Sequence, residues 1–140
     1  MIRGSLFAAI VVLGACTASQ AQSEKPAPDA SQVQAALQAA EAALHAPGVI
    51  TAGLNETADL GDGLTVRPLA VVEDSRCPVD VTCVWAGRLR LRANISGSDT
   101  ELTLGAPNGA VVLTAVTPPP IAHWPANTPK PAYRFGFRRQ

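Results

Sequence analysis

The sequence predicts a mainly β protein. We expect a small antiparallel β-sandwich or barrel, preceded by a lipoprotein signal peptide, a flexible tether and one short alanine-rich helix. After Gly48, apolar and polar residues alternate with a period of two, which is typical of strands with one buried face. Turns rich in glycine, asparagine and proline separate these segments at short intervals. A chain of 140 residues has room for one such domain and a tail.

The start of the chain has the pattern of a bacterial lipoprotein leader. A basic residue is followed by an apolar run that ends in Leu13-Gly14-Ala15-Cys16, with small residues directly before the cysteine. The run is well short of the roughly 20 residues that span a bilayer, which argues against a transmembrane anchor. We expect residues 1–15 to be removed and Cys16 to be lipidated. An ordinary secretory signal, cut a few residues later, is the alternative.

Residues 16–48 are expected to form a tether with a short helix. Alanine, serine, glutamine and proline dominate residues 17–30, and few large apolar groups are present to offset the entropy of ordering. Behind Ser31, a possible cap, apolar residues recur at helical spacing until the helix stops at Pro47-Gly48: Val33, Leu37, Ala40 and Leu44. Since the stripe has few large side chains, this helix is expected to be a spacer or a light cover.

The β-domain is expected over residues 49–140. Alternation predicts a strand over 50–60, broken at Glu56, and a hairpin turn at Gly61-Asp62-Gly63. The next strand changes parity at Pro68, which indicates a bulge or an edge position. Further strands are expected at 83–96, 100–104, 110–116 and 132–138, with turns at 97–98 and 107–109.

Residues 117–131 contain six prolines, so they are expected to form an extended loop in which Trp124 covers one end of the sheet. A proline-rich ligand for a partner's aromatic groove is the alternative interpretation of this segment.

Two cysteines remain if Cys16 carries lipid, and in an oxidising compartment Cys77 and Cys83 are expected to form a disulfide. Five residues separate them, whereas thioredoxin-like redox sites have two, so we expect a structural bridge. Asp74 and Arg76 are expected to brace the loop by hydrogen bonds or an ion pair, with Trp85 packed beside the bridge.

The segment Asp74-Ser75-Arg76-Cys77-Pro78, followed by Cys83-Val84-Trp85-Ala86-Gly87, resembles a motif of small uncharacterised bacterial exported proteins and lipoproteins. The resemblance covers about residues 52–95, with a weaker echo in the terminal strand at 133–137. It implies family membership and brings no activity, ligand or catalytic residue. Aspartate, arginine and tryptophan beside a disulfide suit recognition, so Asp74, Arg76 and Trp85 form a candidate recognition loop.

Five arginines form a second candidate site. Arg88, Arg90 and Arg92 alternate with apolar residues and therefore leave one strand face, and Arg134 and Arg138 repeat the pattern near the C-terminus. If both strands belong to one sheet, five guanidinium groups share its outer face. Such a face could contact an anionic membrane or envelope polymer. A solvated face that deters edge pairing is the alternative.

Catalytic residues, metals and cofactors are not expected. His45 and His123 are too few for a zinc site, and no serine has the flanking glycines of a nucleophile elbow. Glu73 and Asp74 are adjacent strand residues and point to opposite faces. The balance of 11 basic and 11 acidic residues argues against nucleic acid as a partner.

The sequence therefore predicts a lipid-anchored protein of the cell envelope that binds or scaffolds without catalysis. Thr17, in place of aspartate after the cysteine, favours the outer membrane, with the β-domain facing the periplasm. The alternative is an accessory or inhibitor module that presents the Cys77 to Cys83 loop to an envelope protein.

Overall fold

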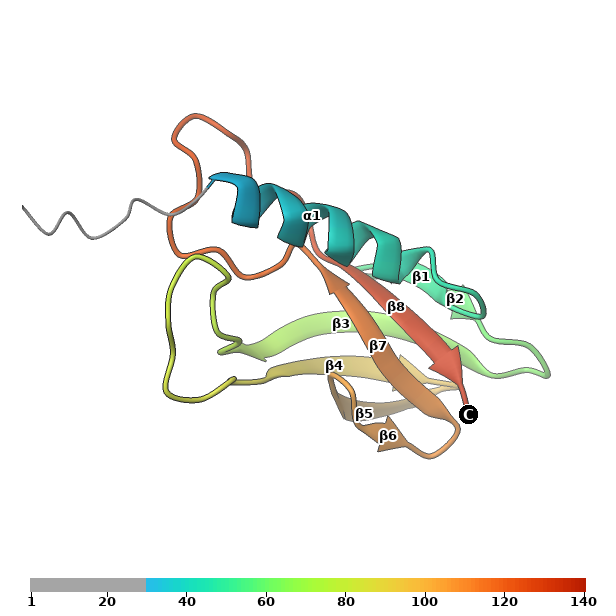
Figure 1. Ribbon diagram of the computed structural model, residues 1–140. Helices are drawn as coiled ribbons and strands as arrows, with labels where there is room; N and C mark the ends of the chain where they lie inside the picture. The colour runs from blue at the N-terminus through green and yellow to red at the C-terminus, as the bar shows by residue number, and fades with distance from the viewer. Residues whose placement is uncertain (1–29) are drawn as a thin grey trace, which may run out of the picture.

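The computed structural model describes residues 30–140, which form helix α1 (Ala30–Leu44) and two antiparallel sheets of four strands each (Figure 1). The first sheet has the order β1 (Ile50–Gly53), β8 (Arg134–Arg139), β7 (Val111–Thr117) and β6 (Pro107–Asn108). The second has the order β2 (Ala58–Asp59), β3 (Thr65–Asp74), β4 (Leu89–Ile95) and β5 (Ser98–Thr103). The predicted mainly β fold is confirmed. The predicted leader, Cys16 and most of the tether lie outside the described residues.

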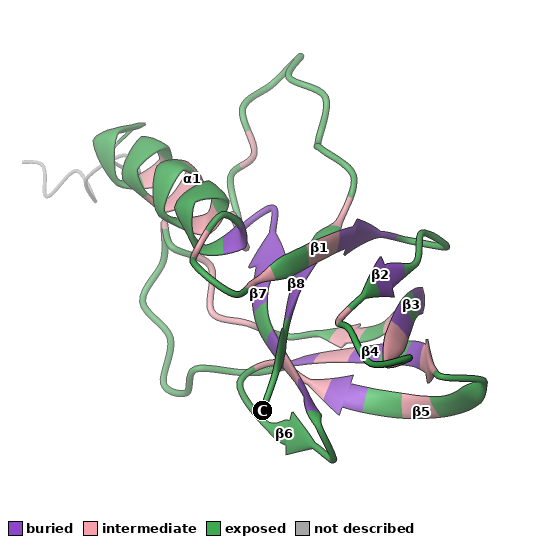
Figure 2. Cartoon of the chain, turned by 90° about the vertical axis from the view of Figure 1, so that its right-hand side faces the viewer, coloured by how far each residue is buried: buried purple, intermediate pink, exposed green. Residues whose placement is uncertain are grey.

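A single apolar core lies between the sheets. Four large side chains of β4 and β8 have no exposed surface, and Figure 2 shows buried segments, in purple, on strands of both sheets: Leu89, Leu91, Phe135 and Phe137. Arg90 and Arg92 occupy the intervening positions of β4, so the period of two predicted from the sequence is confirmed for this strand. Burial of these side chains is the main stabilising term of the domain.

Bulges preserve the inward orientation of the apolar residues where the sequence changes parity. In β3 the pairing with β4 shifts between Pro68 and Ala70, which confirms the bulge predicted at this proline. In β7 a shift between Leu113 and Ala115 lets Leu113 and Val116 both join the core.

Helix α1 covers the outer face of β7 and β8. Its predicted stripe faces the sheet: Val33, Leu37 and Ala40 are half-buried and Leu44 is buried. Gly136, between the two core phenylalanines, lies beneath the helix, and a Cβ there would approach the Val49 Cγ1 atom to 2.7 Å. No helix in residues 30–140 is long and apolar enough to cross a membrane.

The strand predicted over 50–60 is wrong, because the chain changes sheets within it. β1 pairs with β8, whereas β2 pairs with β3. The crossover occurs at Asn55, whose φ is 63°, and the Glu56 carboxylate accepts a hydrogen bond from the Gly53 backbone N–H at 2.7 Å. Residues on both sides alternate in the same way, so the pattern alone does not reveal the change of partner.

Three other predicted boundaries are corrected. The β4 strand begins at Leu89, so residues 83–88 of the predicted strand form a loop. The turn predicted at 97–98 lies at Ser96 and Gly97, both with positive φ, and connects β4 to β5. Pro107 and Asn108, predicted as part of a turn, pair with β7.

The connections gather at two ends of the molecule. At one end, where α1 begins, lie residues 75–88 and 118–132, which we call the loop end (Figure 1). At the other lie residues 60–64, the turn at 96–97 and the C-terminus, which we call the hairpin end (Figure 1). Of the candidate recognition residues, Arg76 and Trp85 map to the loop end, and Asp74 is the last residue of β3 beside it.

Candidate functional site

The loop between β3 and β4 contains the predicted disulfide. Cys77 and Cys83 are bonded, with their Cα atoms 5.9 Å apart, which confirms the prediction. Backbone pairing also continues beyond the strands. The Ser75 N–H donates to the Arg88 carbonyl at 2.8 Å, and the Cys77 N–H donates to the Ala86 carbonyl at 2.8 Å. The base of the loop is therefore a narrow ribbon closed by a bridge.

Gly87 makes this narrow base possible. Its φ is +67°, and a Cβ there would lie 1.7 Å from the Ser75 carbonyl oxygen. A side chain cannot be accommodated at that distance. The positive φ of Gly87 breaks the extended backbone at this point, two residues before β4 begins at Leu89.

Asp74 and Arg76 brace the loop, as predicted. The Arg76 Nε and Nη2 atoms donate to the two Asp74 carboxylate oxygens at 2.8 Å each, and Nη2 also donates to the Pro118 carbonyl at 3.2 Å. The Tyr133 hydroxyl donates to the Asp74 Oδ2 atom at 2.8 Å. This contact was missed from the sequence, because a strand pattern says nothing about which distant side chain lies opposite.

The charges in this cluster shift the pKa values of its members. Burial raises the pKa of Asp74, but the bonds from Arg76 and Tyr133 outweigh burial and the net shift is downward. Burial, followed by the hydrogen bond to the Asp74 carboxylate, raises the pKa of Tyr133. Asp74 is thus held as an anion and Tyr133 as a neutral donor, which suits a structural brace.

Asp80 ties this loop to the proline-rich segment. Its carboxylate has 0% exposed surface and accepts hydrogen bonds from the backbone N–H groups of Ala122 at 2.8 Å and His123 at 2.7 Å. The His123 Nδ1 atom lies 2.9 Å from the same carboxylate. Burial raises the pKa of Asp80, but these bonds outweigh it and lower the pKa to about 2. The sequence carries no local signal for this contact across more than 40 residues.

The apolar side chains of the loop face outward. Val84 is 88% exposed and Trp85 is 77% exposed, and Val79 and Val81 are also exposed. The expectation that Trp85 packs beside the bridge is therefore wrong. The physical reason is that polar groups occupy the inner side of the loop, where the Asp80 carboxylate and the Arg76 guanidinium make their bonds. Trp124 is half-buried, and its indole N–H donates to the Thr128 carbonyl within its own segment.

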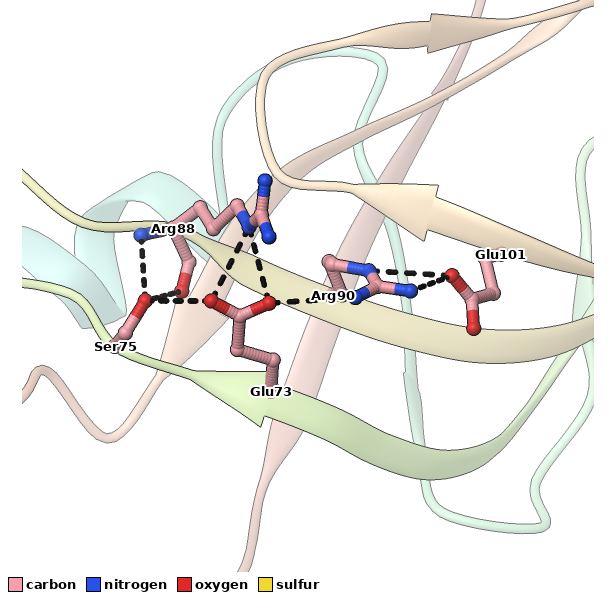
Figure 3. A network of polar contacts seen from close by, with 5 residues as sticks. All are labelled: Glu73, Ser75, Arg88, Arg90 and Glu101. Atoms are coloured by element: carbon pink, nitrogen blue, oxygen red, sulfur yellow. Dashed lines mark hydrogen bonds and ion pairs between the residues drawn. The ribbon is translucent and has the colours of Figure 1, made fainter.

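The single face of five arginines does not form. β4 and β8 belong to different sheets, and Arg88 precedes β4. Figure 3 shows that Arg88 and Arg90 both bind the Glu73 carboxylate, and that Arg90 also binds Glu101. Hydrogen bonds from Ser75 and Arg88 lower the pKa of Glu73, so this carboxylate stays charged beside them.

The other arginines lie apart from this network. Arg134 donates to the Thr51 hydroxyl at 3.4 Å, and Arg138 donates to the Pro47 carbonyl at 3.0 Å. Arg92 is exposed on β4. Contact of these arginines with an anionic surface stays a prediction, but they present two separate groups of charge rather than one.

The described residues offer little for metal binding or acid–base chemistry. Among residues 30–140, no three histidine, cysteine or acidic side chains gather as metal ligands. Asp80 and His123 form an acid–imidazole pair, but within the same residues no hydroxyl or thiol hydrogen-bonds to His123 to complete a triad. Glu73 and Asp74 join different networks, as their alternation predicts.

A hollow of about 410 Å³ at the hairpin end is lined by Leu64, Ile95 and Val111 with polar groups at its rim. Three of these polar side chains, those of Asp99, Thr100 and Asn108, already have hydrogen-bond partners. The Asn94 amide donates to Asp99, and the Asn108 amide donates to the Thr100 hydroxyl. The hollow is thus a weaker candidate than the loop end.

Comparisons of the chain with protein-family models, curated proteins and solved structures found no match. The geometry of the loop end is what indicates its role. That geometry holds uncharged, exposed side chains on a loop fixed by a disulfide, a bidentate ion pair and a buried carboxylate.

Proposed function

We propose that the protein is a lipid-anchored lipoprotein of the cell envelope whose β-domain is a non-catalytic binding module, with the loop end as its binding surface. The observation that carries this proposal is the outward orientation of Val84 and Trp85 on a rigid frame. A small domain gains stability by burying a tryptophan side chain. An exposed tryptophan on a rigid loop therefore indicates that the side chain contacts another molecule or a membrane.

The frame supports binding because it reduces the entropy lost on association. The disulfide and the bonds of Arg76 and Asp80 fix the backbone on which the exposed side chains stand. A binding element that is ordered before contact loses less conformational freedom when the complex forms. The polar atoms of Arg76 and Asp80 form hydrogen bonds within the protein, so the role of these residues is to position the loop.

The lipid anchor is supported by the leader pattern that ends at Cys16 and by Thr17 after it. The resemblance of the Asp74 to Gly87 segment to exported bacterial proteins and lipoproteins agrees with this location. Several acyl chains, as bacterial lipoproteins carry, hold a protein firmly on a membrane, whereas one chain does so only marginally.

The alternative function is an accessory or inhibitor module that presents the same loop to a protein partner. Tryptophan is among the residues most enriched where proteins bind tightly, and Trp85 protrudes as such an anchor does. In this alternative function the loop end is again the binding surface, but a protein partner covers it.

The anchor is tested by fractionation of cells that express the full chain. We expect the wild-type protein in the membrane fraction, with acyl chains on Cys16 in its mass spectrum, and an unprocessed or mislocalised Cys16→Ala variant. A soluble wild-type protein with an N-terminus at Ser19 or Gln22 would show that the anchor is absent.

The binding surface is tested by photocrosslinking in intact cells. A crosslinking amino acid replaces Val84 in one strain and Ser98, an exposed residue of the hairpin end, in another. We expect adducts at position 84 and none at 98. Equal labelling at both positions, or none at 84, contradicts the assignment of the loop end as the binding surface.

A further inference from the structure

We infer that the loop end docks on the bilayer that anchors the chain, with Val84 and Trp85 entering the boundary between headgroups and acyl chains. The inference rests on the proposed lipid anchor and names what the proposed binding surface contacts. Three independent features of the described residues support it: the composition of the loop end, its charge, and its place relative to α1.

The composition of the loop end suits a membrane interface. Both tryptophans of the chain lie there, Trp85 exposed and Trp124 half-buried. Indole rings prefer the headgroup level of a bilayer, where one edge is wet and the other is apolar. Val79, Val81 and Val84 add exposed apolar surface beside Trp85. The three valine side chains supply apolar contact area and carry no hydrogen-bonding group that would select one protein surface over another.

The charge of the loop end also suits an anionic surface. Within residues 75–88 and 118–132 the sequence has one acidic residue, Asp80, and its carboxylate is fully buried. The basic side chain of Lys130 is exposed, and that of Arg88 is exposed but paired with Glu73. At the hairpin end, by contrast, Asp62 and Asp99 are exposed carboxylates; Asp62 pairs with Arg139, and Asp99 accepts a hydrogen bond from the neutral Asn94 amide. Anionic headgroups favour the loop end over the hairpin end, because the exposed Asp99 carboxylate at the hairpin end forms no ion pair within residues 30–140, whereas the loop end has no exposed carboxylate.

The place of the loop end agrees with an upstream anchor. The chain enters α1 at this end, with both loop segments beside the entry (Figure 1). Asp80 and Arg76 bond the two segments to each other, so they meet a surface as one unit. An anchored domain has a high effective concentration at its own membrane, so even a weak contact of Val84 and Trp85 with lipid is populated.

Fluorescence quenching by brominated lipid tests the inference on the full chain. The protein, expressed with its leader and purified in detergent, is reconstituted into phosphatidylethanolamine and phosphatidylglycerol vesicles whose acyl chains carry bromine near the headgroups. A Trp124→Phe variant leaves Trp85 as the fluorophore. We expect bromine to lower its emission about twofold or more, because contact at the interface places the ring within the outer acyl region.

Two further variants make the test specific. In a protein with Trp85→Phe, Trp124→Phe and Ser98→Trp, the fluorophore lies at the hairpin end, and we expect little quenching by bromine. Adding Val84→Glu to the Trp124→Phe variant places a carboxylate at an exposed position, so the fold is retained and quenching of Trp85 should fall.

The outcomes separate this inference from the proposed function. If mass spectrometry shows acyl chains on Cys16 but bromine leaves Trp85 emission unchanged while aqueous iodide quenches it, bilayer docking is wrong and the anchor stands. If bromine also fails to quench Trp85 and crosslinking from position 84 in cells yields an adduct with one envelope protein, the loop end binds a protein. The alternative function is then correct, and docking on the bilayer is wrong. If Cys16 carries no lipid, the anchor fails, and quenching in added vesicles still reports whether the loop end binds lipid.

Discussion

Between the two sheets, Phe135 and Leu91 have no exposed surface and belong to a cluster of buried apolar side chains. In the loop of residues 75–88, by contrast, the Asp80 carboxylate is buried, whereas Val84 and Trp85 are exposed. At these three positions the usual placement of polar and apolar side chains is reversed. The core gains free energy from apolar burial, whereas the loop end holds its shape by polar bonds and a covalent bridge.

The residues that stabilise the fold are therefore different from the residues that we propose for binding. Side chains in the core determine whether the domain folds, and their removal leaves a cavity. Side chains at the tip of the loop stabilise the folded state little, so they are free to serve another surface. The frame of the loop, formed by the disulfide and the bonds of Asp74, Arg76 and Asp80, lies between these extremes. Substitutions in the three groups should therefore differ in size and in what they affect.

Phe135→Ala in the core should have the largest effect. The side chain is fully buried between the sheets, so we expect the free energy of unfolding to fall by about 3–5 kcal/mol. Urea denaturation followed by circular dichroism measures this loss. Val72→Ala, at an exposed residue of β3, is the matched control. A loss for Phe135→Ala no larger than that of the control would contradict the core described above.

Replacing Cys77 and Cys83 together by alanine should have the next largest effect. The bridge closes a loop with a sequence separation of 6, and its removal should lower the free energy of unfolding by about 2 kcal/mol. Any binding activity should persist in the folded fraction, because the bonds of Asp80 and Arg76 remain. The mass of the wild-type protein after alkylation without reduction is the check on the bridge, since two free thiols there would refute it.

Acid should weaken the loop end through Asp80. Its pKa is lowered from 3.8 to about 2 in the folded state, so the unfolded chain binds the proton more readily. The stabilisation is complete above the unfolded pKa and is lost as the pH falls from about 4 through about 2. Asp80→Asn should reduce this loss of stability over that range, as measured by thermal unfolding at successive pH values. Asp59→Asn, a residue next to the hairpin turn, controls for the removal of a negative charge elsewhere.

Trp85→Ala should have the smallest effect on stability. An exposed side chain away from caps and cavities contributes within about 0.5 kcal/mol, so the urea midpoint should hardly move. Crosslinking from position 84 should nevertheless weaken, because the aromatic anchor is gone. A large loss of stability would show that the indole packs in the fold, and unchanged crosslinking would remove Trp85 from the binding surface.

Local patterns predicted much of the architecture. Alternation along β4 identified Leu89 and Leu91 as core residues, and the change of parity at Pro68 identified a bulge. These features depend on residues that are close in sequence, and periodicity reports them directly. The bridge was predicted because Cys77 and Cys83 remain as a pair in an oxidising compartment, and their spacing indicated a structural rather than a redox role.

The pairing of strands was decided by the tertiary structure. The alternation in residues 50–60 is the same whether its two halves join one sheet or two, so the change of sheet at Asn55 has no local signature. For the same reason Arg90 and Arg134, which share a sequence pattern, lie on different sheets. Periodicity specifies which face of a strand is buried, but it does not specify which strands pair with it.

By itself, the sequence determined the mainly β class, the alternating core, the disulfide and the bracing of the loop by Asp74 and Arg76. The tertiary structure alone decided that Asp80 is buried beneath the segment 120–123 and that Trp85 faces outward. The physical reason is that burial of a side chain depends on which distant backbone groups reach it. The N–H groups of Ala122 and His123 satisfy the Asp80 carboxylate across more than 40 residues, and the inner side of the loop is thereby closed to the indole.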